Sequence, residues 1–168
     1  MDSLTLLSAN VLQAPPRLLG WQLTSTAADG TTGGVITEVE AYHGERDAAS
    51  HAHRGPSTRN QPMFEAAGVV YVYRSYGIHL CLNLVTGPAG SAQAILIRSL
   101  RPTIGLPLMQ RRRHQTSTSM LASGPGRVRQ ALGLSLEMTG TKLGDIIRLD
   151  PPPRPINPAE IMTSPSSV

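Results

Sequence analysis

The chain has 168 residues and a formal net charge of +4, and at roughly 100–200 residues per domain this length predicts one domain and excludes a multidomain machine. A lone cysteine, Cys81, excludes an intrachain disulfide and a cysteine-built zinc or iron–sulfur site. The sequence contains no apolar run of the roughly 18 residues that span a bilayer, and its N-terminus lacks a charged signal region. We therefore expect a soluble, cytoplasmic protein without a membrane partner.

The positive charge is concentrated in the middle of the chain. Between His51 and Arg129 there are ten arginines and one acid, Glu65, which gives this stretch +9 and leaves −5 for the rest. Lys142 is the only lysine, and the planar fork of arginine suits phosphate. A polyanion such as nucleic acid is one interpretation, and a solvated arginine-rich surface is the other.

The first half of the chain predicts a helix, a turn, a strand and a loop, in that order. A short helix ends before Gly20, and the Thr-, Ala- and Gly-rich residues 24–34 predict a turn. Alternating β-branched residues at 35–42 predict a strand, and residues 44–61 predict an irregular loop. The predicted strand places four residues on one face: Ile36, Glu38, Glu40 and Tyr42.

The second half predicts a hairpin, two more strands and two helices. Residues 69–73 and 78–85 form the hairpin around Gly77, and Ile78, Leu80, Leu82 and Leu84 make the core face of its second strand. Residues 92–99 predict a central strand and 146–149 a last short one. Helices are expected at 105–113, where Arg111–Arg113 would form a solvated end or a nonspecific phosphate contact, and at 125–132. We expect a domain at 1–150 and a Pro- and Ser-rich tail at 151–168, disordered or a truncated end of the domain.

Glu40 is the first candidate for chemistry. It shares a strand face with Tyr42, ahead of a loop that carries His51 and His53. A carboxylate on a strand face needs a partner, because removing it from water is costly. The partner is either an arginine in a salt bridge or a water for which Glu40 serves as general base. The two histidines are weak grounds for a metal site, and we expect no metal and no cofactor.

All four tyrosines lie between positions 42 and 76. Tyr71 and Tyr73 share one face of a strand, which is typical of core packing. Tyr76 occupies the expected hairpin tip beside Arg74, where nothing requires burial. This is the geometry of a wedge that enters a base stack.

Seven segments of the chain, in the same order, resemble the alkyladenine (3-methyladenine) DNA glycosylase family: residues 38–42, 47–51, 58–64, 68–77, 81–83, 97–98 and 123–127. The resemblance runs from about Leu18 to Ile147. With the predicted elements, it leads us to expect an α+β single domain with a curved, mostly antiparallel β-sheet core, short flanking helices and a protruding β-hairpin. The family's aromatic-rich terminal block has no match in this chain.

The resemblance also implies roles for individual residues. Glu40 would activate the attacking water, and Arg98 would support that water and a nearby phosphate. The base pocket would comprise Tyr42, His51, Tyr73 and Asn83. Tyr76 would fill the gap left in the duplex, and Arg74, Gly126 and Arg127 would contact DNA phosphates.

The implied function is that of a monofunctional DNA glycosylase. It would act as a monomer on double-stranded DNA, flip out an alkylated or otherwise damaged purine, hydrolyse its N-glycosidic bond and start base excision repair. Lyase chemistry requires an activated amine, and the lone Lys142 lies far from the motifs in sequence. Two alternatives stay open: a catalytically weak family member that binds damaged DNA, and a different arginine-rich nucleic-acid-binding protein.

Overall fold

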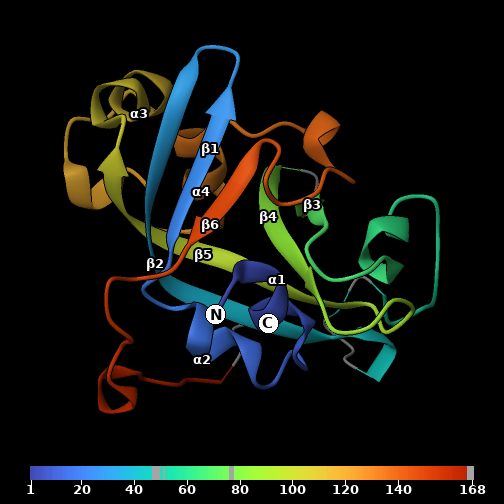
Figure 1. The fold of residues 1–168 in the computed structure, drawn as a ribbon. Helices are drawn as coiled ribbons and strands as arrows, with labels where there is room; N and C mark the ends of the chain where they lie inside the picture. Colours follow the sequence, from blue (N-terminus) through green and yellow to red (C-terminus); the bar gives the residue numbers. More distant parts are fainter. Residues whose placement is uncertain (47–49, 51, 76–77, 166–168) are drawn as a thin grey trace.

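A six-stranded antiparallel sheet, curled into a half-barrel, forms the framework of the protein (Figure 1). The computed structural model describes residues 1–46, 50, 52–75 and 78–165. The strands are β1 (Gln22–Ala27), β2 (Gly30–His43), β3 (Val70–Ser75), β4 (His79–Thr86), β5 (Gln93–Ile104) and β6 (Ile147–Asp150), in the order β3-β4-β5-β2-β1-β6. The expected α+β class is confirmed.

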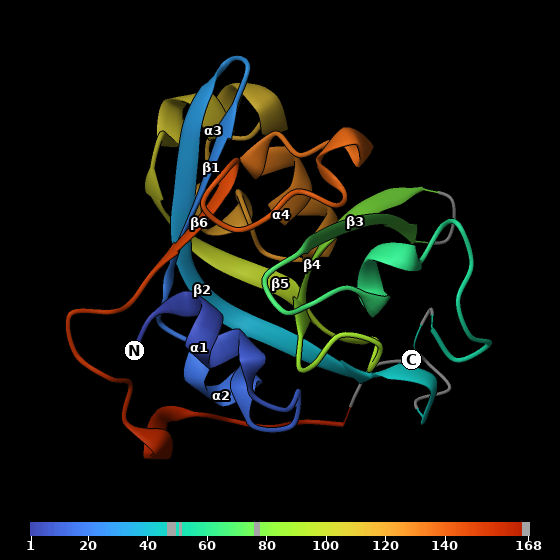
Figure 2. The same ribbon diagram turned by 45° about the vertical axis from the view of Figure 1, so that its right-hand side comes forward.

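In the part of the chain that the structure describes, four short α-helices accompany the sheet: α1 (Ser3–Ser8), α2 (Ala14–Leu18), α3 (Leu106–Arg113) and α4 (Pro125–Leu132). The helices predicted before Gly20, at 105–113 and at 125–132 are confirmed. Gly133 ends α4 with a φ of 67°, in the left-handed region that glycine tolerates best. α4 lies in the hollow of the curled sheet (Figures 1 and 2). Packing against the sheet therefore fixes where the first residues of α4 lie.

The prediction of a turn at residues 24–34 was wrong. Only Ala28 and Asp29 lie between β1 and β2, and the remaining residues of this stretch are in the two strands. Gly33 and Gly34 do not form a turn; they let neighbouring backbones approach closely. A Cβ on Gly33 would lie 2.6 Å from the Leu23 carbonyl oxygen, and one on Gly34 would lie 2.6 Å from that of Arg101. Glycine inside a strand marks such close approach of backbones.

Two clusters of buried side chains occupy opposite faces of β3, β4 and β5. The inner cluster includes Leu82 and Leu84 of β4 and the apolar side of α4. The outer cluster includes Tyr71 and Tyr73 of β3. Both faces are buried because alternate residues of a strand point to opposite sides of the sheet. The predicted core face of β4 is confirmed except at Ile78, which precedes the strand and is 75% exposed.

An irregularity in the β2–β5 pairing decides which residues face the outer side. The pairs on either side of it are Ile36–Leu100, Glu38–Ser99 and Val39–Ile97. Thr37 is therefore an extra residue in β2, and Arg98 is an extra residue in β5. An extra residue shifts the alternation of faces, so Ile36 is buried in the inner cluster, where Val39 also packs. The prediction that Ile36 shares a face with Glu40 was wrong.

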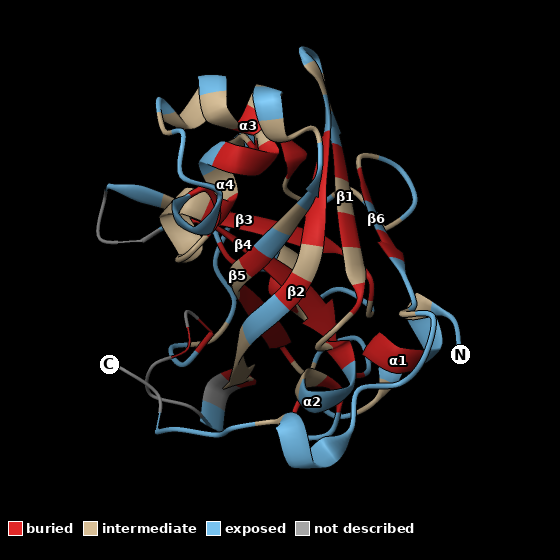
Figure 3. Ribbon diagram, turned by 90° about the vertical axis from the view of Figure 1, so that its left-hand side faces the viewer, coloured by how far each residue is buried: buried red, intermediate tan, exposed pale blue. Residues whose placement is uncertain are grey.

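Residues 151–165 run along the outside of the domain after β6 (Figures 1 and 3). They include one short 3₁₀ turn, Pro158–Glu160, and none of them is buried. The division into a domain at 1–150 and a tail at 151–168 stays a prediction.

Candidate active site

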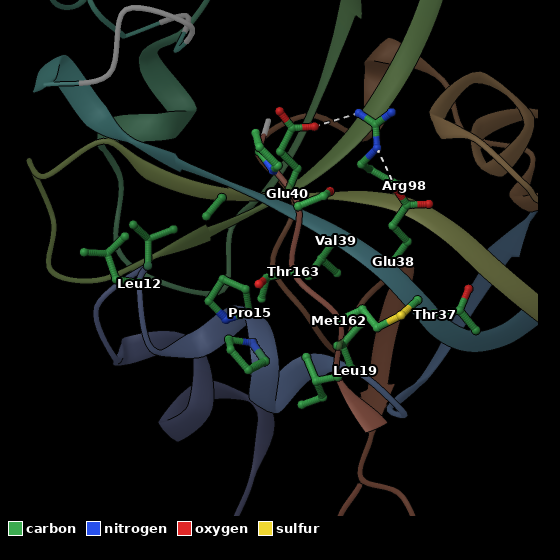
Figure 4. A pocket seen from close by; sticks show the side chains of 16 residues that line it. Leu12, Pro15, Leu19, Thr37, Glu38, Val39, Glu40, Arg98, Met162 and Thr163 are labelled. Atoms are coloured by element: carbon green, nitrogen blue, oxygen red, sulfur yellow. Dashed lines mark hydrogen bonds and ion pairs between the residues drawn. The ribbon is translucent and has the colours of Figure 1, made fainter. Parts of the chain in front are cut away.

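Glu40 and Arg98 face each other from neighbouring strands (Figure 4). Arg98 Nη1 donates to Glu40 Oε2 at 2.6 Å, and the Glu40 side chain is only 11% exposed. Partial burial lowers the pKa of the Arg98 guanidinium, but the charges of Glu40 and Glu38 outweigh this effect and leave the pKa above its usual value. The salt bridge considered for Glu40 is confirmed. It holds the carboxylate in one position, which a general base also requires.

Two tyrosines continue the hydrogen-bond chain from Glu40. The Tyr42 hydroxyl donates to the Glu40 carboxylate and accepts from the Tyr73 hydroxyl. Burial, with the nearby Glu40 charge, raises the pKa of Tyr42 to about 12. Burial first, and then Tyr42, also raises the pKa of Tyr73 above its ordinary value. Both phenols are therefore neutral near pH 7. Tyr73 donates to Tyr42 and Tyr42 donates to Glu40, so each hydrogen bond of the chain points toward the carboxylate.

The strand register places more of the expected pocket residues on the same face. Tyr71, Asn83, Leu96 and Glu40 form one row across β3, β4, β5 and β2. The rings of Tyr71 and Tyr73 stack with centroids 5.5 Å apart, and both rings belong to the outer cluster. Asn83 is buried and its Nδ2 lies 3.5 Å from the Tyr71 carbonyl oxygen. Core packing, which the sequence pattern predicted for the tyrosine pair, is confirmed.

A groove of about 390 Å³ reaches the Glu40–Arg98 pair from the edge of β2 (Figure 4). Leu12, Pro15 and Leu19 line one side of the groove, and residues 161–165 line another. Its volume lies within the roughly 300–1,000 Å³ typical of small-molecule sites. The carboxylate is thus accessible from an open groove while its hydrogen-bond partners hold it in place.

The start of α4 is tied to the strand that carries Arg98. Gly124 N donates to the Arg98 carbonyl oxygen at 2.9 Å, and Leu100 N donates to the Ala122 carbonyl oxygen at 2.9 Å. These two bonds form an antiparallel bridge between Ser99 and Ser123, beyond Leu96, the last residue of β5 that pairs with β4. Arg127 Nη1 donates to Ser123 Oγ at 2.9 Å. The sheet therefore fixes the first turn of α4 next to the candidate site.

The hairpin and α4 also border a second, smaller cleft of about 210 Å³. Arg74 and His79 line it from the hairpin, and Gly126 and Arg129 line it from α4. A Cβ on Gly126 would lie 3.0 Å from His79 Nδ1, so the absence of a side chain there lets the two elements approach. Two of the expected phosphate contacts, Arg74 and Gly126, thus share one basic cleft.

A metal-binding cluster and a membrane-spanning helix are both absent from the described ranges, 1–46, 50, 52–75 and 78–165. No group of three or more His, Cys, Asp or Glu side chains there could hold a metal ion. None of the helices in that part of the chain has the length and apolar character needed to cross a membrane. Cys81 is buried, and burial raises the pKa of its thiol, which disfavours the reactive thiolate.

The sequence of the chain matches a family model described as Methylpurine-DNA glycosylase (MPG) over residues 5–166. The chain belongs to the methylpurine-DNA glycosylase family. The expected family is thereby confirmed, over nearly the whole chain.

Relatives of this family member carry the name "Putative 3-methyladenine DNA glycosylase". One from Rhodopseudomonas palustris is 48% identical over 134 residues, covering 80% of this chain and 63% of the relative. One from Methanoculleus marisnigri is 51% identical over 115 residues, 68% of this chain and 59% of the relative. One from Rubrobacter xylanophilus is 48% identical over 141 residues, 82% of this chain and 73% of the relative. The chain spans about three fifths of the length of the Rhodopseudomonas palustris and Methanoculleus marisnigri relatives.

The residues expected for a methylpurine-DNA glycosylase fall into three groups. Those brought together by contacts or strand register are Glu40, Arg98, Tyr42, Tyr73 and Asn83. Arg74, Gly126 and Arg127 lie around the start of α4, and the first two line the second cleft. His51 and Tyr76 lie outside the described residues. The roles of all ten in DNA binding and catalysis stay predictions.

Sequence reasoning missed two residues beside the site and misjudged Arg112 and Arg113, of which Arg113 donates from Nε to the Leu121 carbonyl oxygen at 3.1 Å. Glu38 forms hydrogen bonds with both Ser99 and Arg98. The sequence signal that could have indicated Glu38 was the pair of acids at positions 38 and 40, two residues apart on one strand. Arg112 of α3 is not a solvated helix end. Its side chain is 10% exposed and binds Asp29 and the Ala131 carbonyl oxygen.

Proposed function

We propose that this chain is a monofunctional DNA glycosylase that releases alkylated or otherwise damaged purines from double-stranded DNA and thereby starts base excision repair. The observation that carries the proposal is the Glu40 carboxylate, which Arg98 and Tyr42 hold on the face of the stacked tyrosines. Membership in the methylpurine-DNA glycosylase family supports it.

Glu40 acts as general base in the proposed reaction. The oxygen of a bound water bonds to C1′ of the damaged nucleotide as the bond from C1′ to the base nitrogen breaks. The base leaves with the bonding electron pair, and Glu40 accepts a proton from the water. An N-alkylated purine is cationic and becomes neutral on leaving, so a strong acid is not required. Arg98 orients the carboxylate and supports the water.

The tyrosines and the basic cleft serve substrate binding. The damaged base must first leave the stack, at a cost of a few kcal/mol that is lowest for a damaged pair. Tyr42, Tyr73, His51 and Asn83 receive it, and Tyr76 fills the vacated space in the duplex. Contacts of Arg74, Gly126 and Arg127 with phosphates offset part of the cost. The enzyme acts in the cytoplasm, as a monomer.

The proposed reaction leaves an intact abasic strand. A lyase step would need an amine that forms a Schiff base at C1′. Lys142, the lone lysine, is exposed and its backbone pairs with Val69 at the start of the hairpin strand. Borohydride trapping with a lesion duplex is expected to give no covalent adduct, and a trapped adduct would contradict the monofunctional assignment.

The experiment incubates the protein with duplexes that carry one 3-methyladenine analogue, hypoxanthine or ethenoadenine, and then cleaves abasic sites with alkali. At least one lesion duplex is expected to be cleaved, and the undamaged duplex is expected to stay intact. Tighter binding to a lesion duplex without base release would favour the catalytically weak member. No preference for any lesion at fixed salt would favour a general nucleic-acid-binding protein.

A further inference from the structure

Arg98 bridges two carboxylates of the same strand, and only one of them has a role in the proposed reaction (Figure 4). Its Nη1 contacts Glu40 at 2.6 Å, and its Nε contacts Glu38 Oε1 at 3.3 Å. Glu38 and Glu40 share a face of β2 because they are two residues apart. The guanidinium is therefore held at two points, and Glu38 supplies the second.

Glu38 is itself fixed from the opposite side. Ser99 Oγ donates to Glu38 Oε2 at 3.2 Å and accepts from Gly124 N at 3.2 Å. Gly124 is the residue before α4, and its N–H also reaches the Arg98 carbonyl oxygen. A continuous set of hydrogen bonds thus runs from the start of α4 through Ser99, Glu38 and Arg98 to Glu40.

Neither stability nor DNA affinity accounts for Glu38. Its side chain is 58% exposed and Arg98 is 27% exposed, and an exposed ion pair of this kind contributes little to folding. An exposed carboxylate beside the proposed DNA site repels phosphate, so it weakens nonspecific binding instead of promoting it. Its side-chain hydrogen bonds are to the Arg98 guanidinium and the Ser99 hydroxyl.

We infer that Glu38 and Ser99 are positioning residues: they fix the Arg98 guanidinium against Glu40 and link it to the first turn of α4, where the phosphate contacts are proposed. This inference rests on the proposed function. Glu38 acts through Arg98 and does not touch the substrate. Its loss lets the guanidinium rotate away from the direction that holds the Glu40 carboxylate toward the water, and misplacement of a catalytic group slows the chemical step.

The test measures base release in single turnovers with enzyme in excess over a lesion duplex, which separates the chemical rate from binding. Glu38→Gln is expected to slow release about ten-fold and to leave the thermal midpoint unchanged. Glu137→Gln is the matched control, because it removes the same charge from an exposed position, on the 3₁₀ turn Leu136–Met138. The dissociation constant of the duplex is not expected to rise in Glu38→Gln, because the substitution removes a charge that repels phosphate.

A double-mutant cycle tests whether Glu38 acts through Arg98. On an Arg98→Ala background, Glu38→Gln is expected to cause no further loss of rate, because the group it positions is gone. A wild-type rate in Glu38→Gln, or the full loss on the Arg98→Ala background, would overturn the inference. Failure of the proposed function looks different: the wild-type protein itself would then release no base, or Glu40→Gln would release it at the wild-type rate.

Discussion

At the scale of single residues, Glu40 owes its position to neighbours of two kinds. Arg98 supplies a charged hydrogen bond at 2.6 Å, and such bonds are shorter and stronger than neutral ones. Tyr42 supplies a neutral donor that is itself held by Tyr73. A carboxylate with fixed donors on both sides needs little reorganisation when it accepts a proton, which is what electrostatic preorganisation requires.

The raised pKa of Tyr42 predicts a loss of stability in alkali. Tyrosine titrates near pH 10 in an unfolded chain, whereas the folded-state pKa of Tyr42 is about 12. The folded state thus favours the neutral phenol, and its contribution is complete below about pH 10 and is lost as the pH rises toward 12. The free energy of unfolding, measured with urea, is expected to fall across this interval. Tyr42→Phe should flatten the fall; an equally steep fall in the variant would contradict the assignment.

At the scale of elements, Arg112 joins three parts of the fold. From α3 it binds Asp29 in the β1–β2 turn, Thr32 Oγ1 in β2 at 3.0 Å and the Ala131 carbonyl oxygen in α4 at 2.8 Å. The bond to exposed Asp29 contributes little. The other two bonds matter more, because their acceptors belong to the buried residues Thr32 and Ala131 and removing the donor leaves these acceptors unsatisfied.

Arg112→Ala is therefore expected to lower the free energy of unfolding by about 1–3 kcal/mol, measured by urea denaturation. Arg111→Ala is the matched control, because Arg111 precedes it in α3 and is exposed; it is expected to change stability by less than about 0.5 kcal/mol. Equal effects of the two substitutions would show that Arg112 does not connect these elements.

The basic cleft between the hairpin and α4 predicts a salt-dependent effect. If Arg74 contacts a phosphate, Arg74→Gln should weaken binding to lesion and undamaged duplexes alike and reduce the slope of log K against log salt by about 1. Arg17→Gln, an exposed change on α2, is the control for net charge. A loss of affinity for the lesion duplex alone would assign Arg74 to the base pocket instead.

Local sequence patterns predicted most of the helices and strands, but they did not predict the local irregularities of the sheet. The β3–β4 hairpin followed from alternation, β5 from its apolar run and α4 from Gly133, because these signals lie within a few neighbouring residues. The extra residues Thr37 and Arg98 could not be predicted, since a bulge is defined by the partner strand. Gly33 and Gly34 misled for the same reason: only the neighbouring backbone distinguishes close approach from a turn.

At the scale of the whole molecule, the sheet buries both faces of β3–β5 and leaves residues 151–165 outside. None of the described residues in that segment is buried. Removal of residues 158–168 is therefore expected to shift the thermal midpoint by less than about 4 °C, the effect of roughly 1 kcal/mol in a domain of this size. Thermal unfolding followed by circular dichroism measures it. A larger fall would place these residues within the cooperative unit and move the predicted boundary at 150.

The same architecture explains how much of the candidate site could be predicted from the sequence. Resemblance to a family supplied Glu40, Arg98, Tyr42, Tyr73 and Asn83, and the strand register brings these residues to one face of the sheet. The order of donors from Tyr73 to Glu40 could not be predicted, because it depends on which hydroxyl is nearer the carboxylate. Glu38 was passed over for a similar reason, since its contacts involve Ser99 and Arg98 from another strand.

The most direct measurement of the central claim is base release by Glu40→Gln. The substitution keeps the size of the side chain and removes the base, so binding to a lesion duplex should persist while the single-turnover rate falls by about 10²–10⁴-fold, the usual contribution of a general base. Release at the wild-type rate by a folded Glu40→Gln variant would contradict the account.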